Sequence, residues 1–300
     1  MYLENLREKI FKKDLGIGET FSAAFDLFKI ILKENKLLAF FQFILIFIPF
    51  TNGYYSHSWI NMMALFGYKY LIPIFFLLSF VLTLVFTVAN NYFIAYFLRK
   101  IALKVEGRAD KFSAKGILIK SLTVLGIGAG LRIILSVLEN LSFIGAFLAL
   151  LAYITVIVVF IWALLYFYDI YYIRNLALSE SIDYSLKLSE GNRLKKIIPG
   201  IILVVGFIIG IMIIILPFSS IVRGFSNGIG IFLVVIVISV VICLFFLYSQ
   251  ALQIVIYLNV ENNYLKNEGK DSKYNFKDKE EIDLRNSQIP NNFSDENNEK

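Results

Sequence analysis

The chain has 300 residues and a net charge of +6; 58% of its residues are hydrophobic and only 17% are charged. Soluble domains carry about 25% charged residues. Here long blocks of Phe, Ile, Leu and Val replace the missing charge, so the composition excludes a water-soluble globule. One Cys and five Pro also exclude a disulfide scaffold and a proline-rich low-complexity chain.

Six segments are long and apolar enough to cross a membrane, because a spanning helix needs about 20 apolar residues for a hydrocarbon core of about 30 Å. In chain order they are residues 37–55, with an expected kink at Pro49, 71–98, 117–138, 141–168, 197–218 and 229–258. Their continuous apolar runs differ from the alternating strands of a transmembrane β-barrel. The sequence therefore predicts an all-α, polytopic integral membrane bundle of six transmembrane helices.

Lys and Arg are concentrated in alternate connecting segments. They lie mainly in residues 1–36, 99–120, 169–197 and 259–300, and outside these only Lys69, Arg132 and Arg223 are basic. Basic residues collect on the cytoplasmic side of membrane proteins, so we expect both termini to be cytoplasmic, in a bacterial cytoplasmic membrane. The net charge is then a topology signal, and nucleic acid is not an expected partner because the basic residues are spread over four segments.

A repeat divides the predicted bundle into three hairpin units. Residues 19–21 (Glu-Thr-Phe) align with residues 180–182 (Glu-Ser-Ile) at an offset of 161, and a fainter copy begins at 112–114 (Phe-Ser-Ala). Each copy precedes an apolar hairpin, so we expect a cytoplasmic amphipathic helix before each pair of spans. The predicted organisation is an N-terminal amphipathic region at 1–36, a bundle at 37–258 and a disordered cytoplasmic tail at 259–300.

Two of the predicted amphipathic helices have apolar residues at helical spacing. The expected stripes are Ile17, Phe21, Ala24, Phe25, Phe28 and Leu32 in the first helix, and Leu178, Ile182 and Leu186 in the second. Ser179 is the expected N-cap of the second helix, with Glu180 near the positive end of its dipole. Such helices either bind membrane lipids or a partner, or act only as connectors that seat the hairpins.

The segment 178–193 resembles one family. Its Ser185, Lys187, Leu188, Gly191 and Arg193 match a Ser-x-Lys-Leu-like segment followed by Gly and a basic residue before the fifth span. This pattern is similar to that of the largely uncharacterised six-span bacterial membrane proteins related to the membrane domain of glycerophosphodiester phosphodiesterases. The resemblance covers about residues 15–260 and implies architecture rather than activity, because no phosphodiesterase catalytic domain accompanies it.

The inventory of catalytic groups is nearly empty. The chain has one His, His57, and one Cys, Cys243, whereas a zinc site needs three or four clustered ligands. Gly126 and Gly130, like Gly206 and Gly210, match the GxxxG pattern that lets membrane helices approach closely. The sequence thus predicts no catalytic, cofactor-binding or metal-binding residue, no cofactor and no enzyme activity.

Polar residues inside the spans are the remaining candidates. Arg132 and Glu139, seven residues apart on one face of the third span, are placed to compensate each other's charge. Either both extend into the outer interface, or Arg132 is the centre of an entry site for an anionic ligand. Five uncharged polar side chains are expected to form interhelical hydrogen bonds rather than a substrate path. They are Gln42, Asn90, Asn91, Gln250 and Gln253.

A second functional class competes with the first. Glu180 and Pro199 have the spacing of the cytoplasmic coupling motif of ABC-importer permeases, although Leu186 occupies the position of its Gly. We therefore expect a non-enzymatic membrane protein acting in envelope or lipid organisation, with a permease subunit energised by a separate ATPase as the alternative. The expected partners are membrane lipids and a cytoplasmic protein that binds residues 178–199. Possible contacts are Arg132, Glu139, Glu180, Lys187 and Arg193.

Overall fold

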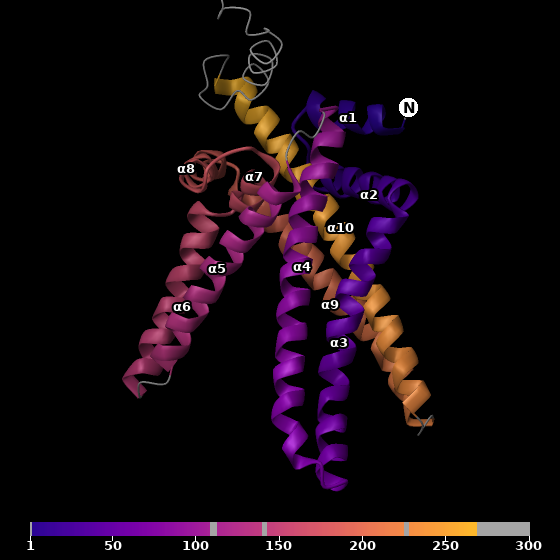
Figure 1. The fold of residues 1–300 in the computed structure, drawn as a ribbon. Helices are drawn as coiled ribbons and strands as arrows, with labels where there is room; N and C mark the ends of the chain where they lie inside the picture. The colour runs from indigo at the N-terminus through magenta and orange to yellow at the C-terminus, as the bar shows by residue number, and fades with distance from the viewer. Residues whose placement is uncertain (1, 109–112, 140–142, 225–227, 269–300) are drawn as a thin grey trace, which may run out of the picture.

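A computed structural model describes residues 2–108, 113–139, 143–224 and 228–268 (Figure 1). Within these residues every regular element is a helix, which confirms the predicted all-α class. The elements are α1 (Tyr2–Lys12), α2 (Ile17–Glu34), α3 (Lys36–Leu65), the 3-10 helix η1 (Lys69–Leu71), α4 (Ile72–Glu106), α5 (Ala114–Glu139), α6 (Phe143–Ala163), α7 (Phe167–Ile173), α8 (Leu178–Ser189), α9 (Arg193–Gly224) and α10 (Gly228–Glu268).

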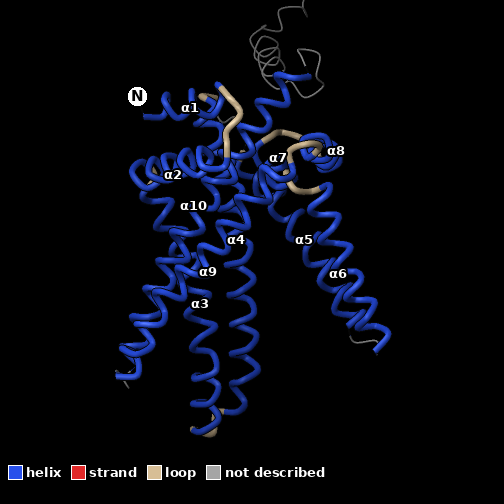
Figure 2. The backbone as a smooth tube through the Cα atoms, turned by 180° about the vertical axis from the view of Figure 1, so that it is seen from behind, coloured by secondary structure: helices blue, strands red, loops and turns tan. Residues whose placement is uncertain are grey.

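The short helices gather at one end of the molecule, and the long helices extend away from it (Figure 1). Figure 2 shows the same arrangement from behind, with the α5–α6 pair diverging from α3 and α4. We call the end that holds α1, α2, α7 and α8 the head; it also includes the adjoining turns of α4, α9 and α10. Most of the buried apolar side chains form one cluster there, so the head contains the core.

The long helices bury little of their apolar surface within the chain. Four have an apolar stretch long enough to cross a membrane: Ile72–Glu106, Ala114–Val137, Arg193–Ile214 and Phe232–Asn267. Between 0% and 22% of the residues in their most apolar windows are buried. Such long unburied apolar surfaces are compatible with an integral membrane protein, whose helices face lipid.

Some of the six predicted spans are found in the structure. Besides the four helices, residues 150–163 and 167–173 pass as one span only if a bend of 59° between them is allowed. The described apolar part of α3, Lys36–Asn52, is shorter than the others. The whole helix continues to Leu65, beyond the predicted end at 55, with Pro49 inside it. Within the described residues, four helices could thus span a membrane by length and composition, or five if the bent pair is one span.

The fourth predicted span, expected as one run over 141–168, is broken because other elements bind its backbone. α6 ends at Ala163, whose carbonyl accepts a hydrogen bond of 2.8 Å from the Ser185 hydroxyl of α8. The Tyr166 amide donates to the same hydroxyl oxygen at 3.3 Å, and the Lys196 ammonium donates to the Leu165 carbonyl at 2.7 Å. These bonds satisfy buried backbone groups that a continuous helix would have paired internally.

The amphipathic helices exist, but their buried faces differ from the predicted stripes. α2 buries Thr20, Ala23, Ala24, Leu27 and Ile31, whereas Ile17 and Phe25 are exposed. α8 buries Ser181, Tyr184, Ser185, Leu188 and Ser189, and Leu186 of the expected stripe is exposed. Among these serines, Ser185 donates to the last carbonyl of α6 and Ser181 to the carbonyl of Ala177 at the start of α8, contacts that hydrophobicity alone does not show.

Two boundaries also differ from the prediction. α10 continues past 258 to Glu268, and Asn259 is buried against the turn after α1. Its amide donates to the carbonyls of Ile10 at 2.7 Å and Lys13 at 2.8 Å. The first ten residues of the expected tail are therefore helical, and 269–300 lie outside the described residues. The third amphipathic helix, expected from the faint copy at 112–114, is not seen as a separate element among the described residues, because α5 begins at Ala114 and residue 112 lies outside them.

Candidate functional site

Arg132 and Glu139, the two charged candidates on the third predicted span, are not seen to form an ion pair. The Arg132 guanidinium donates a hydrogen bond of 2.6 Å to the hydroxyl of Tyr153 on α6. The side chain of Glu139 lies outside the described part of the chain, as does that of His57. Arg132 is therefore connected to the neighbouring helix of its hairpin, and its pairing with Glu139 stays a prediction.

Glu180 has a structural role at the start of α8. Its carboxylate accepts a hydrogen bond of 3.1 Å from the amide of Ala177, the N-cap residue, so the predicted cap at Ser179 is wrong. The acidic side chain also lies at the positive end of the helix dipole. Lys187 lies on the exposed side of the same helix, 3.6 Å from Asp183.

Arg193, the first residue of α9, lies against α6. Its guanidinium carbon is 3.8 Å from the centre of the Trp162 ring, the geometry of a cation–π contact. Its Nε atom is buried and has no hydrogen-bond partner among the described residues. Of the five predicted contact residues, Glu180, Lys187 and Arg193 are thus in the head, and Arg132 is on the α5–α6 hairpin.

A polar pocket of about 520 Å³ lies on the head beside α8. It combines residues from the turn after α1, from α8 and the start of α9, and from the end of α10. They are Asp14, Lys187, Glu190, Asn192, Lys195, Asn263, Tyr264, Lys266 and Asn267. Asp14 is 2.6 Å from the Lys195 ammonium and accepts a bond of 3.0 Å from the Asn263 amide, so the charges are partly neutralised within the pocket.

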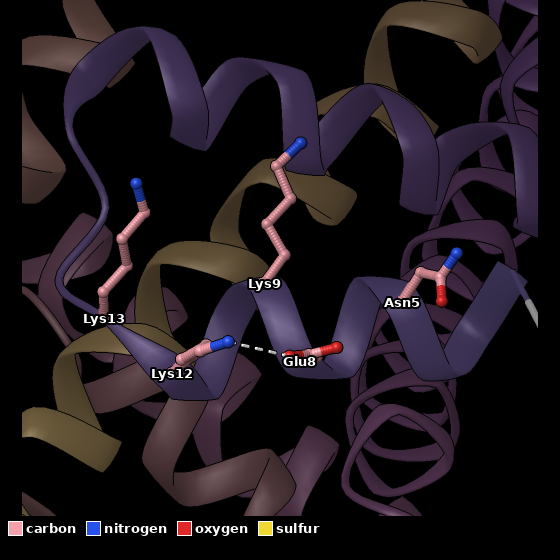
Figure 3. A pocket seen from close by; sticks show the side chains of 5 residues that line it. All are labelled: Asn5, Glu8, Lys9, Lys12 and Lys13. Carbon is pink, nitrogen blue, oxygen red and sulfur yellow. Dashed lines mark hydrogen bonds and ion pairs between the residues drawn. The ribbon is translucent and has the colours of Figure 1, made fainter.

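A smaller pocket of about 270 Å³ is lined by residues of α1 and the turn that follows it (Figure 3). Lys9 and Lys13 extend toward α2, where they meet Ser22 at 2.9 Å and Glu19 at 2.5 Å, respectively. Lys12 is bound to Glu8 of its own helix at 3.0 Å. The ammonium groups of Lys9 and Lys13 thus connect α1 and the turn after it to α2.

The strongest polar cluster of the head is buried, and sequence analysis missed it. The guanidinium of Arg174, which is 4% exposed, binds the Glu106 carboxylate through two nitrogens at 2.8 and 2.5 Å. It also binds Glu261 and donates to the hydroxyl oxygen of Tyr257 at 3.0 Å. Tyr184 donates to Glu261 at 3.3 Å. The Arg174 cluster therefore joins α4, α8 and α10 to the turn after α7.

The charges of the Arg174 cluster stabilise one another. Burial opposes the charge of Arg174, but Glu261, Tyr257 and Glu106 hold its pKa well above the ordinary value. Burial, together with the nearby Glu261 carboxylate, raises the pKa of Tyr184, which stays neutral. A cluster of this kind fixes geometry, because its groups cannot separate without leaving a buried charge unpaired.

Two further basic side chains bind the carboxyl end of α7. The Lys120 ammonium donates to the carbonyls of Tyr171 at 2.6 Å and Arg174 at 2.8 Å, and Arg99 donates to the carbonyl of Ile173 at 2.8 Å. The last carbonyls of a helix have no internal partners and carry partial negative charge. Lys120 and Arg99 belong to a basic segment from which the topology was predicted, and in the structure they also cap the carboxyl end of α7.

Asp169 and Lys196 form a second buried ion pair at the bend between α6 and α7. The carboxylate of Asp169 is fully buried and binds the Lys196 ammonium through one oxygen. Its other oxygen has no hydrogen-bond partner among the described residues. Because Lys196 also donates to the carbonyl of Leu165, the pair helps to fix the bend.

Of the five uncharged polar residues predicted to form interhelical hydrogen bonds, Gln42 and Asn90 form one, whereas Asn91 donates to the carbonyl of Thr87 in its own helix. The Gln42 amide of α3 donates to the Asn90 oxygen of α4 at 3.2 Å, which is the predicted kind of interhelical bond. Gln250 is buried, and neither polar atom of its side chain has a partner among the described residues. The predicted close approach at Gly126, Gly130, Gly206 and Gly210 is not seen among the described residues, where a Cβ atom at each would meet no heavy atom within 4 Å.

The surface of the head offers charged and polar groups for electrostatic binding. Among the described residues no three His, Cys, Asp or Glu side chains are placed to hold a metal ion. No protein-family model, curated protein or solved structure matches this chain.

Proposed function

We propose that this chain is a non-enzymatic integral membrane protein of the bacterial cytoplasmic membrane, with both termini cytoplasmic, that acts in envelope or lipid organisation. The observation that carries the proposal is a cross-linked polar head at one end of long, unburied apolar helices. The concentration of Lys and Arg in the segments that form the head supports a cytoplasmic position for it. The resemblance of residues 178–193 to a six-span family is a further reason.

The head has the properties of a docking platform. The ion pairs of Arg174 and of Lys196 hold its helices together, while Lys187, Lys195 and Lys266 line an open polar pocket on its surface. Basic side chains at a membrane surface attract anionic head groups and acidic partners. The proposed role therefore needs binding by the head and no chemical step.

The test is purification of the tagged full-length chain in mild detergent, with mass spectrometry of all retained proteins and lipids. We expect retained anionic phospholipid without a stoichiometric ATPase. The purified chain should also not turn over phospholipid. Turnover that is lost in Asp169→Asn and kept in the matched exposed variant Asp26→Asn would contradict a non-enzymatic role.

A permease subunit is the second candidate, because α8 lies across the head with an exposed face. This face carries Asp183, Leu186 and Lys187, and an ATPase could dock on it. If the chain is a permease subunit, a cytoplasmic ATPase co-purifies with it at one-to-one or two-to-one stoichiometry. Leu186→Glu should then release it, whereas Leu194→Glu, at a more exposed position at the start of α9, should not.

A further inference from the structure

An apolar groove of about 400 Å³ runs between α9 and α10, next to the bend that follows α6. The two helices lie side by side in Figures 1 and 2 and pack on each other. The groove is lined mainly by aliphatic side chains and one glycine. They include Ile197, Gly200, Ile201 and Val204 of α9 and Leu252 and Ile256 of α10.

The open side of the groove faces the surroundings of the apolar helices. Ile201 is 58% exposed and Val204 is 51% exposed, although both line the groove. From residue 197 to residue 205 the α9 wall is about 12 Å long, at a rise of about 1.5 Å per residue. This length is less than half of a hydrocarbon core of about 30 Å, so the groove fits within one leaflet.

The head-side end of the groove is basic. Lys196 lines it and is already bound to Asp169 and to the carbonyl of Leu165. Arg193 lies one turn earlier on the same face of α9, because residues 193, 197, 200 and 204 are three or four positions apart. Its guanidinium is stacked on Trp162, and no hydrogen bond from it to another described residue is seen.

Trp162 indicates the depth at which the head-side end of the groove lies in the membrane. Its side chain is 60% exposed and is one of two Trp residues in the chain. Tryptophan rings collect at membrane–water interfaces, where lipid head groups lie. An arginine held flat against such a ring can bind a phosphate through its two terminal nitrogens, and it binds phosphate more specifically than a lysine does.

We propose that this groove binds one anionic phospholipid, with the phosphate at Arg193 and an acyl chain between α9 and α10. Aliphatic walls match the chain, and a basic end at interface depth matches the head group. Gln253, on the α10 wall, supplies an amide that can donate to an ester carbonyl. The inference rests on the membrane function proposed above and adds a defined site to it.

Gly200 provides the first test. A Cβ atom at Gly200 would meet no heavy atom within 4 Å, so Gly200→Leu fills the groove without a backbone clash. Gly206 is the matched control, because it is on the same helix, also faces open space and does not line the groove. Native mass spectrometry of the full chain titrated with dioleoyl phosphatidylglycerol should show one tight site that Gly200→Leu weakens at least tenfold and Gly206→Leu leaves intact.

Arg193 provides the second test. Arg193→Gln should weaken phosphatidylglycerol binding about fivefold, the factor that corresponds to about 1 kcal/mol for one basic residue at a membrane surface. Binding of phosphatidylcholine of the same chains should fall much less, because its head group has no net negative charge. Lys36→Gln is the matched control, since it removes one exposed basic residue at the start of a different long helix.

Three results would overturn the proposal. The first is equal binding by Gly200→Leu and Gly206→Leu when both elute and melt like the wild type. The second is an unchanged lipid preference in Arg193→Gln. The third is displacement of the lipid by millimolar glycerol 3-phosphate, which would show a site for a free phosphate instead. If lipid is still retained by the groove variants, the proposed membrane role stands, whereas a co-purifying ATPase contradicts that role and not the groove.

Discussion

Arg174 connects elements that are far apart in the sequence. Its partners Glu106 and Glu261 are 68 and 87 positions away in the sequence, on α4 and α10. A buried ion pair adds little net stability relative to apolar packing, but removal of one partner leaves the other charge uncompensated. The Arg174 cluster therefore fixes the relative positions of the helices that it joins in the head.

We predict that Arg174→Met destabilises the chain by about 3–5 kcal/mol, because two buried carboxylates lose their main partner. Lys187→Met is the control: Lys187 and Asp183 are about half exposed, and exposed pairs contribute about 0–1 kcal/mol. Thermal unfolding in detergent, followed by intrinsic fluorescence, measures both variants. Similar melting temperatures for the two would show that the Arg174 cluster is not essential for the head.

The start of α2 should depend on pH. The Lys13 ammonium and the Gly16 amide lower the pKa of Glu19 below its ordinary value of 4.5. A lowered folded-state pKa gives a contribution that is present above the ordinary value and is lost as the pH falls through the folded-state value. We expect the hydrogen-exchange protection of residues 16–20, corrected for intrinsic rates, to fall below about pH 4.5 in the wild type. In Glu19→Gln it should not change over that range.

At the scale of elements, the bend between α6 and α7 is made by groups from other helices. Ser185 of α8 binds both the Ala163 carbonyl and the Tyr166 amide, and thereby occupies the place of a missing helical bond. The apolar run of 141–168 contains no signal for this break, because the serine that stabilises it follows about twenty residues later.

We predict that Ser185→Ala costs about 1–3 kcal/mol, since it leaves two buried backbone groups without a partner. Ser179→Ala, on the exposed side of α8, should change stability by no more than about 0.5 kcal/mol. The same thermal unfolding experiment compares them. A larger loss of stability in Ser179→Ala than in Ser185→Ala would support Ser179 as the N-cap, as predicted from the sequence, and would contradict the geometry of α8.

At the scale of the whole molecule, the head and the far ends of the long helices lie at opposite ends (Figure 1). Phe66, in the turn between α3 and α4, is exposed, and Asn267 is near the end of α10 in the head. In the proposed spanning arrangement, a hydrocarbon core of about 30 Å lies between these two positions.

We predict that a membrane-impermeant maleimide labels Phe66→Cys in intact cells and labels Asn267→Cys only after permeabilisation. Cys243→Ser provides the cysteine-free background, because Cys243 is the only Cys in the chain and is buried. Labelling of both positions in intact cells would contradict a spanning arrangement. The reverse pattern would place the head outside.

The sequence by itself determined that this is an all-helical chain with long apolar segments, because composition and continuous apolar runs are properties of neighbouring residues. It also located two amphipathic helices, α2 and α8. Only the tertiary structure decided which faces of these helices are buried, where α6 ends, and that Arg174, Glu106 and Glu261 meet. The physical reason is that such contacts depend on distant residues: periodicity marks an apolar face, but the partner that buries it is set by packing.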